Sequence, residues 1–347
     1  MNPFFTIKNR RVGLDYPPLV IAEIGINHNG SLREAFKLVD AAQTAGCEII
    51  KHQTHIPAEE MSPLAQKTIP GNSSYSIWDI MSRCALSEQD EFALKEYVEN
   101  KGMIFISTPF SFAAIERLEK MDVPAYKIGS GEMNNDEFVR CIAQKKKPII
   151  LSTGMNDIHA VRKAVHCIQE FHNDFAILHT TNLYPTKPEQ IRLGALEEIH
   201  REFPMAIIGL SDHSLNNLAC LAATALGASI LERHFTDTKD RIGEDIACSM
   251  TPQECRTLIH DSGEIAKMRG GNKTPLKEEE ITMQFAFGTI VAARNIPAGK
   301  KLERSDLTTK RPGIKGIRAE ELSHIIGKTT KKAIAFNEHL MPEDLIP

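Results

Sequence analysis

Two histidines follow short apolar runs in the sequence, and their positions suggest a shared site. His213 ends the run 206–213, and His234 lies near the end of the next run, 229–235. If both runs are neighbouring parallel strands, their carboxyl ends lie at one edge and both imidazoles can reach a single point. Imidazole pairs bind Mn²⁺, Zn²⁺, Co²⁺ and similar divalent ions. We therefore predict a metal site that leaves open positions for substrate oxygens, although the spacing does not identify the ion.

Two lysines also continue apolar runs, where a charged side chain needs a partner. Lys51 lies in CEIIKHQT and Lys127 lies in VPAYKIGS. A buried lysine must find an anion or lose its charge, and hydroxyl and amide groups add further donors to that anion. Such groups follow other apolar runs at Thr108, Ser130, Ser152 and Asn182. The pattern favours a bound phosphate or carboxylate over ion pairs with a purely structural role.

Every apolar run ends in polar or charged residues, which a barrel with only a structural role does not need. The further candidates at these ends are Glu23, Gln53, Tyr184, Ser211 and Glu232. Strand ends often meet solvent, and this alternative explains some of the Ser and Thr residues. It explains the lysines poorly, because they directly continue buried runs.

The elements that must position these residues are eight apolar runs, each typical of a strand buried on both faces. The runs cover residues 18–25, 47–54, 103–110, 123–130, 148–155, 175–182, 206–213 and 229–235. Amphipathic segments between them predict helices. This alternation predicts an α/β fold, a closed parallel (β/α)₈ TIM barrel with its chemistry at the carboxyl ends of the strands. An open doubly wound sheet is the alternative, but no GxGxxG follows the first run.

Serine caps and terminal glycines mark several of the expected helices. The segments with such boundaries are 31–46, 87–102 and 214–227, and another helix is expected from Pro252. The connection 55–86 is too long for a simple link, so we expect it to be a functional loop.

A glycine- and charge-rich segment separates two regions of different texture. We expect a catalytic barrel domain over 1–268, a linker over 269–284 and a small second domain over 285–347. The second domain shows short strands and turns. A unit of that size is marginal alone and needs support from another surface.

The composition is that of an ordinary globular protein. The chain has 347 residues, of which 42% are hydrophobic and 25% are charged, and its net charge is −4. No basic field attracts nucleic acid, and no run approaches the ~20 apolar residues of a membrane span. The seven cysteines form no CxxC pair, and the N-terminus shows no signal peptide. We expect a cytoplasmic protein without nucleic-acid or membrane partners.

Taken together, ten stretches resemble the bacterial N-acetylneuraminic acid (sialic acid) synthases over essentially the whole chain. They are EIGINHNGS, KHQTH, IPGN, FISTPF, KIGSGE, ILSTGMN, HTTNLYPT, GLSDH, LERHFTD and KRPG. Residues 285–347 are similar to the antifreeze-like (SAF) domain of these synthases. The resemblance implies that phosphoenolpyruvate condenses with N-acetylmannosamine to give N-acetylneuraminic acid and phosphate. It also implies a divalent ion, foremost Mn²⁺ with Mg²⁺ or Co²⁺ as alternatives, and a domain-swapped homodimer.

The resemblance further implies roles for individual residues. The phosphoenolpyruvate-binding set would be Lys51, Thr108, Lys127, Ser130, Ser152, Asn182, Tyr184 and Ser211. The catalytic set would be Lys51, Lys127, Glu23 and Glu232, with Glu23 the first candidate for deprotonating water and Glu232 its rival. His213 and His234 would bind the metal. The sugar-binding set would be Gln53, Asn72, Asp245 and Arg311. Arg311 would reach from the second domain of one subunit to the N-acetyl group in the other subunit's barrel.

One departure from the family pattern concerns the sugar end of the pocket. Glu244 stands in Gly-Glu-Asp where relatives usually carry Gly-Pro-Asp. A legionaminic acid synthase, or next a pseudaminic acid synthase, acting on a 6-deoxy diacetamido hexose is therefore the alternative. Another phosphoenolpyruvate-dependent synthase or a divalent-metal aldolase is a more distant alternative. A binding protein for ice or glycans, with the barrel as scaffold, would not need the lysines and histidines together.

Overall fold

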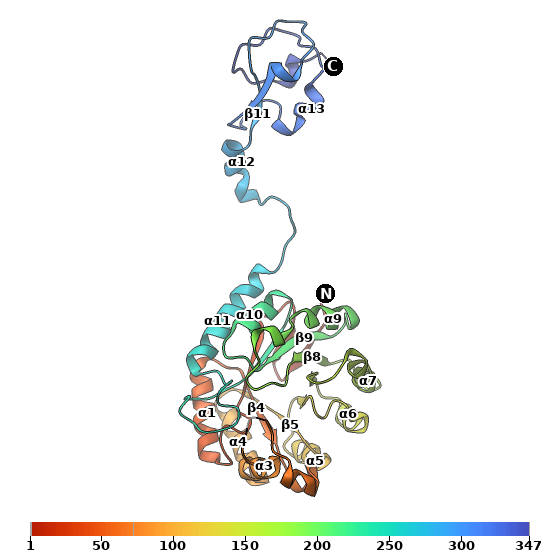
Figure 1. Ribbon diagram of the computed structural model, residues 1–347, viewed down its shortest axis with the longest axis vertical. Helices are drawn as coiled ribbons and strands as arrows, with labels where there is room; N and C mark the ends of the chain where they lie inside the picture. The colour runs from red at the N-terminus through yellow and green to blue at the C-terminus, as the bar shows by residue number, and fades with distance from the viewer. Residues whose placement is uncertain (1, 72, 347) are drawn as a thin grey trace. The chain divides into compact units, whose positions relative to one another are not determined.

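In the computed structural model, which describes residues 2–71 and 73–346, eight parallel strands close into a barrel (Figure 1). The strands are β3 (Leu19–Glu23), β4 (Ile49–Thr54), β5 (Ile104–Pro109), β6 (Tyr126–Ile128), β7 (Ile149–Ser152), β8 (Phe175–Thr180), β9 (Ile207–Asp212) and β10 (Ile230–His234). Consecutive strands are neighbours around the ring, and β10 pairs with β3 to close it. The predicted barrel is confirmed, and each predicted run contains one strand.

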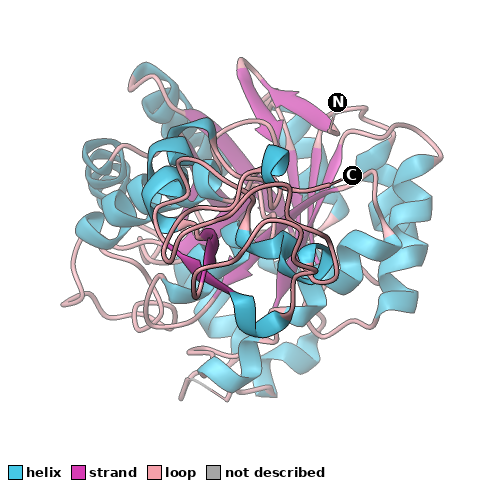
Figure 2. Cartoon of the chain, turned by 90° about the horizontal axis from the view of Figure 1, so that it is seen from above, coloured by secondary structure: helices cyan, strands magenta, loops and turns pink. Residues whose placement is uncertain are grey.

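Helices surround the strands of the barrel (Figure 2). They are α1 (Leu32–Ala45), α2 (Pro57–Glu60), α3 (Ile77–Cys84), α4 (Glu88–Asn100), α5 (Phe112–Lys120), α6 (Asp136–Ala143), α7 (Ile158–Gln169), α8 (Pro188–Ile191), α9 (Gly194–Glu202), α10 (Leu218–Ala225) and α11 (Pro252–Met268). The caps of α1 are as predicted, because the Ser31 hydroxyl accepts the Glu34 N–H and Gly46 takes a φ of 90°. The long connection 55–86 contains α2, a 3₁₀ helix over Pro63–Lys67 and α3.

The predicted start of α10 at Ser214 was wrong. The helix begins at Leu218, because the Ser214 hydroxyl donates to the Asp212 carboxylate at 2.8 Å and to the Asn216 carbonyl at 3.1 Å. Ser214 therefore belongs to the loop after β9 and does not cap the helix.

A hairpin that the sequence analysis did not predict closes the amino end of the barrel. Strands β1 (Phe4–Ile7) and β2 (Arg10–Gly13) pair antiparallel. The hairpin buries Phe5, Ile7 and Val12 in one apolar cluster with residues from the barrel interior. Those interior residues are Leu19, Ile21, Ile49, Ile104, Ile106, Ala125, Ile150, Ala176, Leu178, Ile207 and Ile230. The amino half of the barrel is therefore a packed apolar core.

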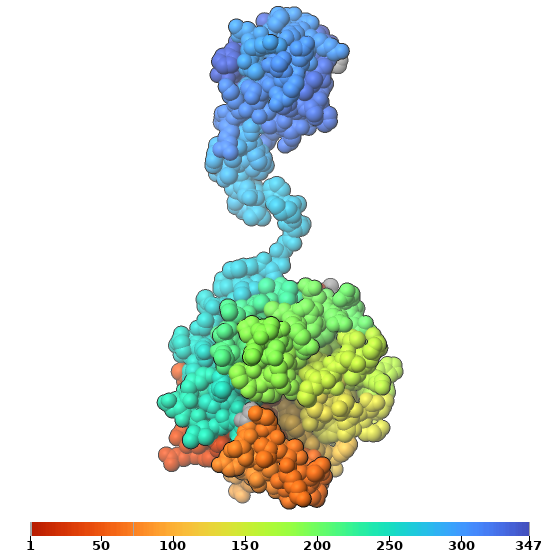
Figure 3. All heavy atoms as spheres, in the orientation of Figure 1, coloured from red at the N-terminus to blue at the C-terminus, as the bar shows by residue number. Residues whose placement is uncertain are grey.

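The chain divides into two units, Met1–Gly270 and Gly271–Pro347, and Figure 3 shows the atoms of each in space-filling form. The second unit contains a 3₁₀ helix over Lys277–Glu279, α12 (Glu280–Ala286), β11 (Thr289–Ala292), β12 (Leu307–Lys310) and α13 (Leu322–Ile325). Strands β11 and β12 pair antiparallel beside a separate apolar cluster that includes Ile290, Leu307 and Leu340. Helix α12, which the sequence analysis did not predict, overlaps the expected linker.

None of the helices in the described part of the chain is long and apolar enough to cross a membrane.

Candidate active site

A cavity of about 270 Å³ opens at the carboxyl ends of the barrel strands. It brings together the predicted residues Lys51, Gln53, Thr108, Lys127, Ser130, Ser152, Asn182, Tyr184, Ser211, His213, Glu232 and His234. It also adds Phe110, Glu132, Met155 and Thr180 to the lining. Residues far apart in the sequence therefore share one pocket, as the strand-end pattern predicted.

A network of two lysines and two glutamates lies at the base of this cavity, and three of its members line the wall. Lys51 makes an ion pair with Glu23, and its Nζ lies 3.5 Å from Glu232 Oε1. Lys127 Nζ lies 3.8 Å from the same Glu232 oxygen. All four side chains are buried. Glu23 contacts the cavity only through its partners, because it does not itself line the wall.

The surroundings within this network shift the pKa values of its members in different directions. Burial alone would lower the pKa of Lys51, but the Glu23 and Glu232 carboxylates outweigh it and raise that pKa. Burial lowers the pKa of Lys127 to about 8, although Glu232 opposes the shift. Burial would raise the pKa of Glu232, but Lys127 and Lys51 lower it. Lys51 is therefore a stable cation at neutral pH, while Lys127 is the lysine poised to lose a proton.

Hydroxyl groups surround the lysines on the β5 to β7 side of the cavity. Lys127 donates to Ser152 Oγ at 2.6 Å, and Lys51 donates to Thr108 Oγ1 at 3.3 Å. Ser130 Oγ accepts the Gly154 N–H at 2.9 Å. Cationic and hydroxyl donors at one point can bind the oxygens of a phosphate or carboxylate.

Gly154 is the residue that lets the loop after β7 approach this cluster. A Cβ at this position would lie 1.7 Å from the Asn182 amide oxygen and 2.9 Å from Ser130 Oγ. Neither atom could stay in place beside any larger residue. The glycine in ILSTGMN therefore keeps Asn182 and Ser130 within one small space.

The two predicted metal ligands lie side by side at the other edge of the cavity. The His213 and His234 ring centroids are 5.4 Å apart, and Tyr184 stacks on His213 at 4.2 Å. Burial lowers the pKa of each histidine to about 4, so both rings are neutral at pH 7. Neutral imidazole is the form that binds metal ions.

The hydrogen bonds of the histidines fit a divalent ion. His213 Nδ1 donates to the Thr181 carbonyl at 2.8 Å, which leaves Nε2 with its lone pair. Within the described residues, His234 Nδ1 has no hydrogen-bond partner, and its nearest charged neighbour is Asp245 Oδ2 at 3.6 Å. No group of three or more His, Cys, Asp or Glu among those residues is arranged to hold an ion. A metal on this pair would therefore need oxygens from substrate or water.

Gln53 is fixed by residues that the sequence analysis missed. Its Nε2 donates to Glu23 Oε1 at 3.2 Å, and its Oε1 lies 3.0 Å from His55 Nε2. His55 Nδ1 in turn lies 3.0 Å from Glu60 Oε1. Residues 53 and 55 are two apart, so strand alternation places them on one face, and His55 directly follows the end of β4 at Thr54. In the sequence, the histidines of KHQTH were the feature that could have indicated that His55 holds Gln53 in place.

The remaining sugar-binding candidates lie elsewhere or outside the described residues. Asp245 lies in the loop after β10, where burial raises its pKa to about 6 although His213 opposes the shift. Asn72 lies outside the described residues. Arg311 is an exposed residue of the second unit, directly after β12. The role of Arg311 in binding the N-acetyl group of the sugar stays a prediction.

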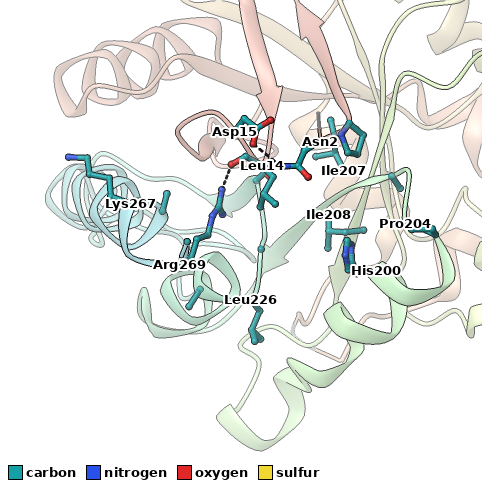
Figure 4. A pocket seen from close by; sticks show the side chains of 17 residues that line it. Asn2, Leu14, Asp15, His200, Pro204, Ile207, Ile208, Leu226, Lys267 and Arg269 are labelled. Carbon is teal, nitrogen blue, oxygen red and sulfur yellow. Dashed lines mark hydrogen bonds between the residues drawn. The ribbon is translucent and has the colours of Figure 1, made fainter. Parts of the chain in front are cut away.

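A larger cavity of about 500 Å³ lies at the amino end of the barrel (Figure 4). Its wall includes Leu14, Asp15, His200, Leu226 and Arg269. The Arg269 guanidinium is already bonded to the backbone carbonyls of residues 14, 224 and 228. Asp15 accepts a hydrogen bond from the Asn2 amide at 2.7 Å. In the described part of the chain, the lining of this cavity has no counterpart of the buried lysine–glutamate network or of the histidine pair at the carboxyl end.

Comparison with known proteins gives two family matches along the chain. The NeuB family matches residues 38–274, and the SAF domain matches residues 288–346. The chain is 35% identical to a Methanocaldococcus jannaschii protein named uncharacterized protein MJ1065, with 98% of each chain covered. It is 31% identical to the N,N'-diacetyllegionaminic acid synthase of Legionella pneumophila, with 94% of each covered.

A solved structure shows the same similarity in three dimensions. It is the N-acetylneuraminic acid (sialic acid) synthetase of Leptospira borgpetersenii in complex with citrate, with a TM-score of 0.75 and 27% identity. The match covers 82% of this chain and 96% of that one.

Proposed function

The chain belongs to the NeuB family, and from that premise we propose that it condenses phosphoenolpyruvate with N-acetylmannosamine. The products are N-acetylneuraminic acid and phosphate. The observation that carries the proposal is the shared cavity of the Lys51–Glu23–Glu232–Lys127 network and the His213–His234 pair. Anion binding and metal binding in one pocket suit a substrate with phosphate and carboxylate groups that reacts with an aldehyde.

Phosphoenolpyruvate lies among the donors that β4 to β9 and their following loops bring to the cavity in this proposal. Its binding residues are Lys51, Thr108, Lys127, Ser130, Ser152, Asn182, Tyr184 and Ser211. Lys127 and its Ser152 partner donate to one anionic group, and Lys51 with Thr108 donates to another. These groups hold C3 of the enol toward the histidines, so that proximity replaces a collision in solution.

The His213–His234 pair would hold Mn²⁺, with Mg²⁺ or Co²⁺ as alternatives, on their available ring nitrogens. When bound, such an ion acts as a Lewis acid toward the aldehyde oxygen of the open-chain sugar. Tyr184 packs on His213 and limits where that ring can turn.

The bonds in the proposed reaction balance as follows. The C3 carbon of phosphoenolpyruvate forms a bond to the aldehyde carbon, and the aldehyde oxygen becomes a hydroxyl. Water adds to C2, and the C–O bond to phosphate then breaks, leaving a ketone. The first proton that water loses goes to Glu23, with Glu232 as the alternative acceptor, and the aldehyde oxygen gains one proton in return. The second proton of water leaves with the phosphate when the ketone forms. Both carboxylates lie beside Lys51, and the two lysines lower the pKa of Glu232 in spite of its burial.

Four residues are proposed for the sugar side. Gln53 positions the aldehyde, because Glu23 and His55 fix its amide. Asp245 lies beside His234 and would accept sugar hydroxyl groups. Asn72 would add a further contact. Arg311 would come from the partner in a domain-swapped homodimer and bind the N-acetyl group.

A second acceptor sugar has specific support. The Legionella relative is named N,N'-diacetyllegionaminic acid synthase, and Glu244 replaces the usual proline beside Asp245, where it lines a neighbouring hollow with Ser73 and Arg83. The alternative proposal is therefore legionaminic acid synthesis, with pseudaminic acid synthesis after it, from a 6-deoxy diacetamido hexose. The binding of phosphoenolpyruvate and metal would be the same.

The deciding experiment measures phosphate release from phosphoenolpyruvate with Mn²⁺ and two acceptors at equal, sub-saturating concentration. The acceptors are N-acetylmannosamine and 2,4-diacetamido-2,4,6-trideoxymannose. We expect a higher kcat/KM with N-acetylmannosamine. Preference for the diacetamido sugar would move the product to legionaminic acid, and no release with either sugar would reject the synthase proposal.

A further inference from the structure

Each of the two histidines at the cavity directly follows a charged residue that points the opposite way. Side chains alternate along a strand, so Ser211 and Glu232 face the cavity while Asp212 and Arg233 face outward. Arg233 and Asp212 are also register partners across β9 and β10. The Arg233 side chain is 1% exposed, and an arginine is rarely so deeply buried unless its charge is paired.

Arg233 connects three separate segments behind the site. Its Nη2 donates to the Ser214 carbonyl at 2.6 Å, directly after His213, and to the Cys248 carbonyl at 3.4 Å. Its Nη1 donates to Asn217 Oδ1 at 2.7 Å. The planar guanidinium therefore fixes the loop after β9, the start of α10 and the loop after β10 at once.

Asp212 completes this network from the other strand. Its Oδ2 lies 3.4 Å from Arg233 Nε, and its carboxylate accepts the Ser214 N–H at 2.9 Å and the Ser214 hydroxyl at 2.8 Å. His213 thus lies between two residues that are both held by side-chain hydrogen bonds. Asn217 extends the network, because its Nδ2 donates to the Glu254 carbonyl of α11 at 2.8 Å.

We propose that Arg233 is a positioning residue for the His213–His234 pair and sets its affinity for a divalent cation. The inference rests on the metal site of the proposed function. Arg233 would not contact the cation, but it bonds the Ser214 carbonyl after His213, lies beside the Asp212 carboxylate before it, and itself directly precedes His234 on β10. Two ligands hold an ion well only when their separation is fixed in advance, and partners behind the ligands typically change metal affinity by ~10–100-fold.

A second, partly buried arginine in the same barrel provides a control. Arg117 on α5 makes an ion pair with Glu91 on α4 at 3.1 Å, and the Glu91 side chain is 0% exposed. Glu91 Oε2 also accepts the Thr54 hydroxyl at 3.1 Å. This pair has the same charge chemistry as Arg233 and Asp212, with the Arg117 side chain 13% exposed, and its hydrogen bonds and ion pairs join α4, α5 and β4 rather than β9, β10 or the loops after them.

The experiment titrates the full-length chain with MnCl₂ and follows free Mn²⁺ by electron paramagnetic resonance. The variants are Arg233→Lys, Arg117→Lys and His213→Ala, each also measured by thermal melting. Lysine keeps the positive charge of Arg233 but cannot bond three segments at once. We expect Arg233→Lys to weaken Mn²⁺ binding at least tenfold, while Arg117→Lys binds as the wild type does and melts at a similarly lowered temperature.

A milder variant covers the case in which Arg233→Lys does not fold. Asn217→Ala removes one acceptor of Arg233 together with the bond to the Glu254 carbonyl, and should weaken Mn²⁺ binding by a few fold. Loss of binding in His213→Ala together with wild-type binding in both Arg233→Lys and Asn217→Ala would overturn the inference alone. Wild-type binding in His213→Ala would overturn the proposed metal site, and this inference with it.

Discussion

The same strands carry opposite kinds of side chain at their two ends. On the inner face of β4, Ile49 is followed two residues later by Lys51, and on β10, Ile230 is followed by Glu232 and His234. All five side chains are buried. The amino end gains stability from apolar packing against the β1–β2 hairpin, whereas the carboxyl end holds charges that an apolar core would replace at no loss of stability. The comparison separates residues that serve folding from residues that serve chemistry.

Replacing His213 by Ala should give the largest effect and should affect activity alone. A Lewis acid contributes several kcal/mol to such a reaction, so kcat/KM should fall by about 1,000-fold. The melting temperature should change little, because the ring is neutral at pH 7 and borders the cavity. Phosphate release at limiting Mn²⁺ measures kcat/KM, and thermal denaturation measures the melting temperature. His166→Ala, on the exposed side of α7, is the control, and full activity of His213→Ala would contradict the assignment.

Replacing Lys127 by Met tests the anion site in the same end of the barrel. The change removes a buried cation that faces phosphoenolpyruvate, and truncating one partner of a buried charge pair costs ~2–5 kcal/mol of binding. We expect kcat/KM for phosphoenolpyruvate to fall about 100-fold in steady-state kinetics. Lys163 is an exposed residue of α7, and Lys163→Met should keep the wild-type kcat/KM. An unchanged kcat/KM in Lys127→Met would place the anion elsewhere.

Replacing Phe5 by Ala, at the amino end, should lower the stability of the protein and leave its activity unchanged. Phe5 is 4% exposed within the hairpin cluster, and such truncations lower the free energy of unfolding by ~3–5 kcal/mol. The neighbouring Phe4 is 42% exposed, so Phe4→Ala is a matched control with a much smaller expected loss. Urea denaturation measures both, and kcat should stay at the wild-type value. A fall in kcat that matches the loss of stability would mean that the two ends are not separable.

Lys127 should make pH act in opposite directions on activity and stability. Because burial lowers its pKa to about 8, the folded protein loses this proton before the unfolded chain does. Between pH 8 and about 10.4 the unfolded chain binds more protons, so the contribution of Lys127 to stability rises with pH. Over the same window kcat/KM for phosphoenolpyruvate should fall about tenfold per pH unit, because a neutral amine does not attract an anion.

The pH prediction is measured by rate profiles and by denaturation of the wild type and Lys127→Met at pH 7.5 and 9.5. A stability difference between the two proteins that does not change with pH would contradict the lowered pKa.

Replacing Glu244 by Gln should give the smallest effect, at the rim of the carboxyl end. Glu244 makes an ion pair with Arg83 at 3.0 Å and accepts a hydrogen bond from Ser73 at 3.3 Å. Partly exposed pairs of this kind contribute ~0.2–1 kcal/mol. We expect a change of a few fold in KM for the sugar and none in kcat. Glu88→Gln, which breaks the exposed pair with Lys120, is the control and should leave both constants unchanged.

The barrel was predictable because its eight strands are continuous apolar runs that end in polar residues. The hairpin was not, because β1 and β2 have only four residues each and only part of each is buried. Its role depends on packing against the barrel interior, which no local pattern shows. The start of α10 was misjudged because Ser214 has two competing partners for its hydroxyl group, and only the fold reveals them.

The cavity was predictable from strand ends, but its supporting residues were not. His55 bonds Gln53, although we had expected it not to share the face of Gln53. Glu132 was noted among the polar residues at the strand ends, but no role was predicted for it, and it lines the cavity from the loop after β6. No role was predicted for Arg233 in LERHFTD, because its three hydrogen-bond partners come from segments that are separate in the sequence. Strand alternation identified what faces the cavity, while the residues behind the site required the tertiary structure.

The most direct test of the account uses phosphoenolpyruvate labelled with ¹⁸O in the bridging oxygen between C2 and phosphorus. The full-length protein is incubated with this substrate, Mn²⁺ and N-acetylmannosamine, and the released phosphate is analysed by mass spectrometry. We predict that the phosphate carries the label and appears only when the sugar is present. Unlabelled phosphate, or release that does not depend on the sugar, would contradict the proposed condensation.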